Sequence, residues 1–202
     1  MKKKQAKGGS GGGLAMPKAP PLPPHPEHRG EPVRVGPYTI LAGGIRDLVA
    51  EDLEKADVLI PLLDSLPRLE FGRPYQILAA PLADYGGVPN NWEQFLREQV
   101  IPLLATEKKV LAFCHGSHGR TGCFLASLIA ILETPEETPD PIAAVRKRHC
   151  KKAVESQAQA EAVFALRGEK LPQKYSMEFT KKPATVWPLP QDNWWNFLPT
   201  AH

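Results

Sequence analysis

Residues 114–120, with the sequence CHGSHGR, place a cysteine, two histidines, two glycines and an arginine within seven positions. The apolar segment KVLAF at 109–113 precedes them, and the largely apolar segment 123–132 follows. This order predicts a loop between a strand and a helix. In open parallel sheets, ligands bind at the carboxyl ends of the strands, where such a loop lies. Residues 114–120 are therefore the first candidate site.

The residue types in this loop fit the binding and attack of a phosphate group. The first N–H groups of a helix lack intrahelical partners and carry a partial positive charge, and glycines let successive N–H groups converge on one anion. The same field favours the nucleophilic thiolate of Cys114. The planar fork of Arg120 matches two oxygens of a phosphate. The pattern predicts a nucleophile beside a cradle for a tetrahedral dianion.

The Cys-x5-Arg arrangement resembles the active-site loop of the protein tyrosine phosphatases, especially their compact dual-specificity branch. Thr121 and Gly122, directly after the arginine, also fit, and the resemblance covers about residues 36–168. It implies a phosphocysteine formed on Cys114, no metal, and a Thr121 hydroxyl that stabilises the departing thiolate. It also implies that the oxyanion is bound by Arg120 and by the loop residues His115, Gly116, Ser117, His118 and Gly119.

Two positions differ from the usual pattern of this family. Phe113 stands where a histidine usually precedes the cysteine, and Ser117 stands where glycine usually occupies the third of the five middle positions. The first change removes a polar neighbour of Cys114. The second places a side chain where backbone freedom is normally needed. Both changes bear on the level of activity more than on the fold.

The resemblance implies a general acid on an upstream loop, because cleavage of a phosphate ester needs a proton for the leaving oxygen. Asp84 lies thirty residues before Cys114 in the segment PLADYGGVP, whose glycines provide freedom and whose proline limits it. We expect Asp84 to be this acid. In bacterial members a glutamine on a late helix positions water for the second step; here Gln159 is the first choice and Gln157 the alternative.

Several functions fit this loop. A phosphorylated protein, above all phosphotyrosine protein, is the expected substrate. Inositol phosphates, phosphoinositides and RNA 5′ phosphates stay open because of His115, His118 and the cationic run 146–152. A phosphate-binding module with little catalysis is another class, supported by Phe113 and Ser117. Sulfur transfer of the rhodanese type is the weakest alternative, since it gives Asp84 no role.

The cysteines and histidines do not have the spacing of a structural zinc site. Cys114, His115 and His118 are too close in the sequence, and no second pair of ligands follows. We therefore expect no metal and no cofactor. Three cysteines, Cys114, Cys123 and Cys150, are an odd number without the spacing of a disulfide framework, which favours a reducing, cytoplasmic compartment.

Apolar periodicity predicts alternating strands and helices. Strands are expected at 38–42, 57–63, 75–82 and 109–113, and helices at 47–56, 92–105, 120–133, 138–150 and 155–166. Asp140 and Pro141 fit the cap and the first turn of a helix, and Pro102 fits a kink. The alternation predicts an α/β domain with a central, mostly parallel sheet flanked by helices.

Composition divides the chain into three parts: a Lys-, Gly- and Pro-rich disordered tail at 1–30, a cysteine-phosphatase domain at 31–170, and a Trp- and Pro-rich extension at 171–202. Residues 1–29 carry a net charge of +5 and the whole chain +3, which leaves −2 for the rest. A core with this charge is not expected to bind nucleic acid. The apolar runs are too short to span a bilayer, so no membrane is expected, and each tail is a candidate partner-binding segment.

Overall fold

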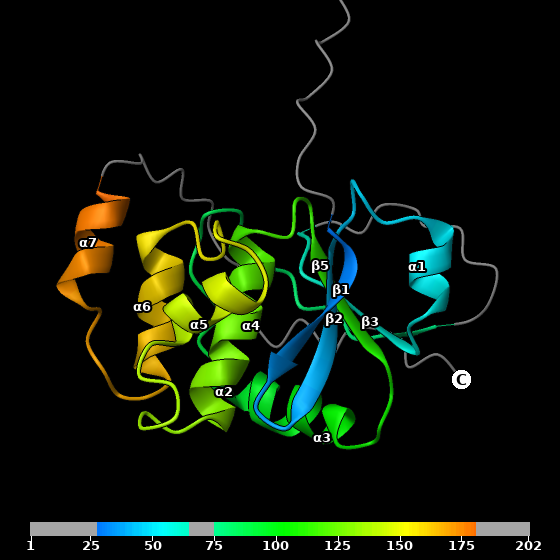
Figure 1. The fold of residues 1–202 in the computed structure, drawn as a ribbon, viewed down its shortest axis with the longest axis horizontal. Coiled ribbons are helices and arrows are strands. Elements are labelled where there is room, and N and C mark those ends of the chain that lie inside the picture. Colours follow the sequence, from blue (N-terminus) through cyan, green and yellow to red (C-terminus); the bar gives the residue numbers. More distant parts are fainter. Residues whose placement is uncertain (1–27, 65–74, 181–202) are drawn as a thin grey trace, which may run out of the picture.

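The computed structural model describes residues 28–64 and 75–180 (Figure 1). The sheet has the strand order β1-β2-β5-β3-β4, and only β1 is antiparallel to its neighbour. The expected mostly parallel sheet is therefore confirmed. The strands span β1 (Arg29–Val35), β2 (Tyr38–Gly44), β3 (Val58–Pro61), β4 (Gln76–Ile77) and β5 (Val110–Cys114).

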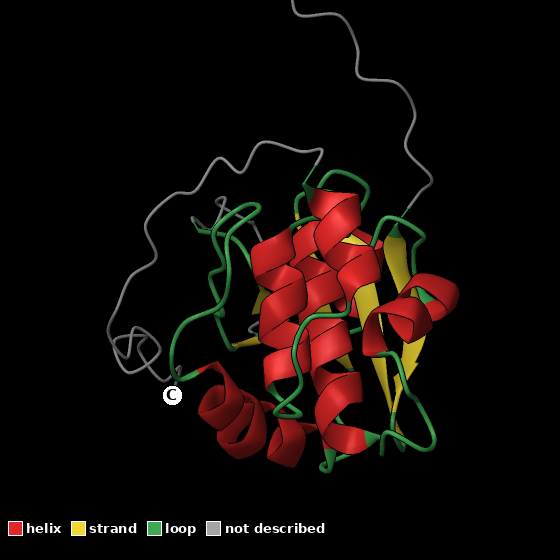
Figure 2. Cartoon of the chain, turned by 90° about the vertical axis from the view of Figure 1, so that its left-hand side faces the viewer, coloured by secondary structure: helices red, strands yellow, loops and turns green. Residues whose placement is uncertain are grey.

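Helices cover both faces of this sheet. Helices α4, α5, α6 and α7 lie on one side and α1 lies on the other (Figures 1 and 2). The helices span α1 (Ala50–Glu54), α2 (Trp92–Phe95), α3 (Ile101–Leu104), α4 (Gly119–Leu132), α5 (Pro141–Arg148), α6 (Gln157–Ala165) and α7 (Gln173–Phe179). Within the described residues, no helix is long and apolar enough to cross a bilayer.

The parallel strands end at one edge of the sheet. Gly44 at the end of β2 is paired with Cys114 at the end of β5, and Pro61 of β3 is paired with Phe113. Strands β3 and β5 are buried along their whole length, as expected for strands covered on both faces. The loops that follow β2, β3 and β5 therefore begin side by side.

Helix α4 is enclosed by other elements on all sides, and its residues are largely apolar around the whole circumference. Its residues from Gly119 to Ala130 are buried, which is the pattern of a helix enclosed by other elements. One polar side chain on it, Ser127, accepts a hydrogen bond of 3.0 Å from the indole N–H of Trp92. The first turn of α4, at Gly119–Gly122, is therefore enclosed by other parts of the domain.

The predicted helix at 92–105 is interrupted by a π-helical turn, η1 (Leu96–Val100), between α2 and α3. At its end, the N–H of Ile101 donates to the carbonyl of Leu96, five residues earlier. Pro102 follows directly and has no N–H to continue the regular ladder. The expected disturbance at Pro102 therefore takes the form of one wider turn just before the proline.

Two ordered elements lie outside the predicted pattern. Strand β1 begins at Arg29, within the segment expected to be a tail, and pairs with β2. Helix α7 lies beyond residue 170, where no regular element was expected, and the hydroxyl of its Tyr175 donates to Asp140 at 2.9 Å. Asp140 caps α5 as predicted, because it accepts the N–H of Ala143 at 2.8 Å. The proline-rich segment 18–26 and Trp187, Trp194 and Trp195 lie outside the described residues.

Glu133, directly after α4, links three parts of the fold. Its carboxylate accepts two hydrogen bonds from Arg148, at 2.5 and 2.8 Å, one from the hydroxyl of Thr138, and one from the N–H of Gly36 at 2.8 Å. Partial burial alone would raise its pKa, but these donors together lower the pKa of Glu133 to about 2.

Replacing this carboxylate, in the variant Glu133→Gln, is expected to lower the free energy of unfolding by about 2 kcal/mol at pH 7, because charge-assisted hydrogen bonds are lost. Since the folded-state pKa is depressed, the wild-type advantage is complete above the unfolded pKa, about 4.3, and disappears as the pH falls towards 2. Urea unfolding at pH 7, 4 and 3 measures this. The exposed Glu136→Gln is the control, and an equal loss in both variants contradicts the prediction.

Candidate active site

A pocket of about 230 Å³ opens at the carboxyl edge of the sheet. Among the predicted site residues, it brings together Cys114, Arg120 and Asp84 with the loop residues His115, Gly116, His118 and Gly119. Ser117, Thr121 and Gln159 are buried and are not part of its lining. Residues 114–120 therefore form one wall of a real cavity, and Asp84 faces it from another loop.

The loop turns sharply at Ser117. This residue has a φ of 59°, in the left-handed region that costs most side chains about 1–2 kcal/mol. His149, after α5, holds it: its Nε2 lies 2.7 Å from the carbonyl oxygen of Ser117 and 3.1 Å from the hydroxyl. The shorter contact requires an N–H at Nε2, and burial lowers the pKa of His149, so the neutral ring donates. The loop thus keeps the left-handed turn with serine where glycine is usual.

Backbone contacts turn the carbonyl groups of the loop outward. The N–H of Ile45 donates to the carbonyl of Cys114 at 2.8 Å, and the N–H of Arg46 donates to the carbonyl of His115 at 3.4 Å. Among the described residues, no hydrogen bond has the backbone N–H of His115, Gly116 or Ser117 as its donor. These N–H groups are the donors that an anion in the pocket would use.

This contact needs a glycine at the end of β2. A Cβ atom at Gly44 would lie 2.9 Å from the carbonyl oxygen of His115 and 3.1 Å from the carbonyl carbon of Gly116. Because real Cβ contacts are not this short, a side chain there would displace the loop. Gly44 therefore permits the close approach of the sheet edge and residues 115–116.

Arg120 is buried in the first turn of α4, with a side chain only 3% exposed. Its Nε lies 3.4 Å from a carboxylate oxygen of Asp84, and a terminal nitrogen lies 3.7 Å from Asp64. Within the described residues, Nε has no hydrogen-bond partner. A buried cation that faces a cavity, with an Nε that makes no hydrogen bond to the two nearby carboxylates, has a donor to offer a bound anion.

Asp84 is more than half exposed and lies at the start of a tight turn. The N–H of Gly86 donates to the carbonyl of Ala83 at 3.0 Å, and Tyr85 between them has a φ of 55°. The pKa of Tyr85 is raised, mainly by the nearby carboxylate of Glu155 and further by burial and by Asp84. Its phenol therefore stays protonated at neutral pH. The turn therefore places one carboxylate and one phenol at the pocket.

The two predicted residues behind the lining contribute differently. Thr121 is fully buried, and its hydroxyl has no hydrogen-bond partner among the described residues. Gln159 is buried against the loop: a Cβ atom at Gly119 would lie 3.2 Å from its Nε2, and its Oε1 accepts the N–H of Glu155 at 2.9 Å. Gln157 instead is exposed and donates to Glu161. Of the two glutamines, Gln159 is the one beside the loop.

Four lining residues were not identified from the sequence: Arg46, Tyr85, Lys152 and Glu155. Arg46 follows a strand that ends beside Cys114, so the predicted parallel pairing was the available signal. Lys152 belongs to the cationic run 146–152. Lys152 is the member of that run that lines the pocket, whereas Arg146 pairs with Glu178 and Arg148 with Glu133.

Phe113 is fully buried in the core. Its backbone follows the sheet pairing and accepts the N–H of Leu62 at 2.8 Å. An aromatic ring at this place therefore packs inside the domain and does not reach the cavity, whose lining includes no atom of Phe113.

Comparison with solved structures identifies the fold. The structure of Tk-PTP in its active form aligns with a TM-score of 0.52, covering 68% of this chain and 97% of that one at 18% identity. The chain has the protein tyrosine phosphatase fold. A human tyrosine phosphatase-like serine/threonine/tyrosine-interacting protein shares 17% identity over 69% of this chain and 95% of its own, with a TM-score of 0.49. In the phosphatase fold, residues 114–120 form the loop between the central strand and the central helix.

Sequence comparison adds one relative. No family model matches the chain. An uncharacterized protein of Methanocaldococcus jannaschii is 34% identical over 97 residues, which is 48% of this chain. The matched part spans 58% of the length of that protein, so the likeness extends over little more than half of it.

Proposed function

We propose that this protein hydrolyses phosphate monoesters through a phosphocysteine intermediate. The observation that carries the proposal is the meeting of Cys114, Arg120 and Asp84 in one pocket, with Asp84 3.4 Å from the Arg120 guanidinium. A nucleophile, a fixed cation and an exposed carboxyl group are the three parts that this reaction needs.

In the first step, the thiolate sulfur of Cys114 attacks phosphorus. A sulfur–phosphorus bond forms while the ester oxygen–phosphorus bond breaks, and the electron pair of that bond goes to the leaving oxygen. Asp84 donates its proton to this oxygen, so an alcohol or phenol departs rather than an alkoxide. The position of Asp84 at the pocket, on an element separate from Cys114, supports this division of roles.

Charge on the transferred phosphoryl group is stabilised by groups already in place. Arg120 and the loop N–H groups hold the three equatorial oxygens through the transition state. These donors sit in a buried wall, where they act more strongly than they would in water. The hydroxyl of Thr121, which has no hydrogen-bond partner within residues 28–64 and 75–180, stabilises the thiolate when Cys114 leaves in the second step.

In the second step, water replaces cysteine. Asp84, now a carboxylate, takes a proton from the water. The water oxygen attacks phosphorus as the sulfur–phosphorus bond breaks. Inorganic phosphate and the Cys114 thiolate are released. Gln159 is proposed to position the water. Its buried side chain lies against Gly119, the residue before Arg120.

Phosphotyrosine protein is the substrate class that we propose. A second class is supported by one observation: Arg46 and Lys152 add cations to the lining, beyond the Arg120 that binds the reacting phosphate. Additional cations suit an inositol phosphate, a phosphoinositide or an RNA 5′ end. A phosphate-binding module with little catalysis shares the same cradle but releases no phosphate.

Phosphate release from matched substrates tests these classes. We expect the wild-type kcat/KM for a phosphotyrosine peptide to exceed those for an inositol polyphosphate and a 5′-phosphorylated RNA by at least about 10-fold, since a few fitted contacts discriminate by that factor. The opposite order assigns the protein to the non-protein class. Binding of inorganic phosphate with no release from any substrate would refute hydrolysis.

A further inference from the structure

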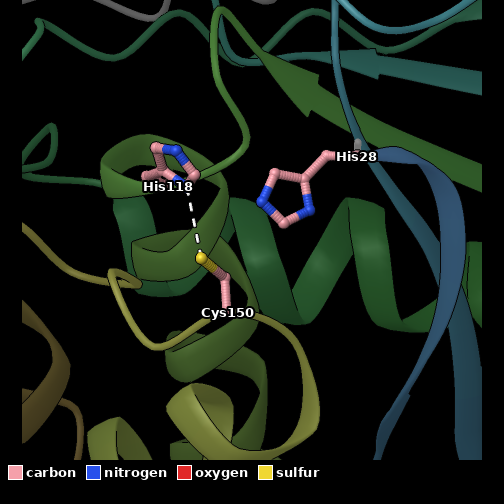
Figure 3. Close-up of side chains that lie close together, drawn as sticks. All are labelled: His28, His118 and Cys150. Atoms are coloured by element: carbon pink, nitrogen blue, oxygen red, sulfur yellow. Dashed lines mark hydrogen bonds between the residues drawn. The ribbon is translucent and has the colours of Figure 1, made fainter. Parts of the chain in front are cut away.

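Three side chains that are distant in the sequence meet beside the candidate active site. His28 precedes β1, His118 belongs to the loop before α4, and Cys150 follows α5. One possible ligand atom from each lies within 4.8 Å of the others, and all three residues are buried. Figure 3 shows the two rings and the sulfur pointing into a common space, with the sulfur of Cys150 3.2 Å from Nδ1 of His118.

His28 has a nitrogen without a partner in this cluster. Its Nε2 is buried and makes no hydrogen bond with any residue that the structure describes. Its other nitrogen, Nδ1, lies 3.8 Å from a carboxylate oxygen of Glu31. In metal-binding histidines the second ring nitrogen commonly faces a carboxylate, which is the arrangement of His28 and Glu31. A buried nitrogen left unbonded is costly, and a metal ion would satisfy it.

Cys150 supplies the sulfur of this cluster. Its sulfur accepts a contact from the N–H of Lys152 at 3.4 Å in addition to that with His118. An N–H directed at sulfur stabilises a negative charge on it. When a divalent metal binds, the thiol proton passes to solvent and the sulfur–metal bond forms, without oxidation or reduction.

We infer that His28, His118 and Cys150 bind a zinc ion. Two imidazoles and one thiolate are a borderline-soft ligand set that suits zinc, with a water molecule as the fourth ligand. Tetrahedral zinc with these ligands separates the ligand atoms by about 3.4–3.6 Å. Separations within 4.8 Å therefore require side-chain movements of about 1 Å. The ion and one thiolate leave one positive charge, which faces Glu31.

Two of the ligands are fixed from outside the cluster. The N–H of His28 donates to Asp47 at 3.2 Å, and the carbonyl of His28 accepts the N–H of Gly44 at 2.9 Å. The carbonyl of Cys150 accepts the N–H of Ala153 at 2.8 Å. A zinc ion would tie these anchored segments to His118 and so hold the phosphate-binding loop from behind.

This site differs from the zinc site considered in the sequence. Cys114 and His115 line the pocket, whereas the buried partners of His118 are His28 and Cys150. His28 and His118 are 90 residues apart in the sequence, and His118 and Cys150 are 32 residues apart. Such spacings do not indicate a metal site. The inference does not depend on the proposed phosphatase function, because metal binding is measured directly.

The test uses the full chain, freed of metal with a chelator and titrated with zinc in competition with a chromophoric chelator. We expect one equivalent of zinc to bind. The Cys150→Ser and His28→Gln variants are expected to bind at least about 100-fold more weakly, since even outer partners of a metal site contribute 10–100-fold. Cobalt in place of zinc should give a thiolate-to-metal charge-transfer band that Cys150→Ser lacks.

Two control variants test whether the other two cysteines contribute to zinc binding. Cys114→Ser removes the pocket thiol, and Cys123→Ala removes a thiol that is fully buried among core residues. Both are expected to keep one equivalent of zinc. The inference is overturned if the wild-type chain binds no zinc, if Cys150→Ser binds it as well as wild type, or if Cys114→Ser is the variant that loses it. Urea unfolding of each variant confirms that it is folded.

Discussion

Cys114→Ser is expected to reduce phosphate release from an aryl phosphate by more than about 10³-fold, because removing the nucleophile of a covalent mechanism abolishes the low-energy path. The variant should still bind inorganic phosphate within a few-fold of wild type, since Arg120 and the loop N–H groups are unchanged. A malachite-green assay measures the first quantity, and calorimetric titration with inorganic phosphate measures the second.

The matched control for this experiment is Cys123→Ala. Burial raises the pKa of the Cys123 thiol to about 12, so it stays protonated and cannot act as a nucleophile at neutral pH. Its loss is expected to leave kcat within a few-fold. If Cys114→Ser retains more than a tenth of the wild-type rate, cysteine is not the nucleophile and the mechanism is wrong.

Asp84→Asn is expected to lower kcat by about 10²–10³-fold with phenyl phosphate, whose leaving group needs a proton, and much less with p-nitrophenyl phosphate. An amide has nearly the same shape as the carboxyl group and cannot supply the proton. The ratio of the two losses, measured in the same phosphate-release assay, reports general-acid catalysis.

Asp64→Asn separates this role from simple electrostatics. Asp64 also faces Arg120, at 3.7 Å compared with 3.4 Å for Asp84, and it too is exposed. Both variants replace a carboxyl group beside the guanidinium by an amide, but Asp64 does not line the pocket. We expect Asp64→Asn to change both substrates by the same small factor. A leaving-group dependence equal to that of Asp84→Asn would show that the effect comes from Arg120 and not from proton transfer.

The part of the site that could be predicted lies within one short segment or at one sheet edge. Cys114 and Arg120 are separated by a single loop, and the strand and helix around them are strongly apolar, so local sequence places them. Asp84 could be anticipated because it follows the strand predicted at 75–82, although the strand itself is shorter and β4 ends at Ile77, seven residues before Asp84. All three line the pocket.

What could not be predicted depends on contacts between distant segments. Strand β1 could not be recognised from its sequence, because only Val33 and Val35 are buried and the rest includes Gly30, Pro32 and two arginines. The role of His149 in holding Ser117, and the meeting of His28 with Cys150, arise only when α5 packs against α4. Such contacts between distant segments leave no pattern in the apolar periodicity of the segments themselves.

Besides the contacts from β2 and its following loop, several contacts that support residues 117–122 come from segments later in the chain. Ser117 contacts His149, Gly119 lies against Glu155 and Gln159, and Gly122 lies so close to residues 153–154 that an added Cβ atom would be 2.7 Å from the backbone nitrogen of Val154. A chain emerging from the ribosome as far as α4 would already contain Cys114 and Arg120 but none of these supports. The loop therefore gains these later contacts, and the pocket gains Lys152 and Glu155, only after α5 and α6 have docked, so that completion of the pocket coincides with completion of the domain.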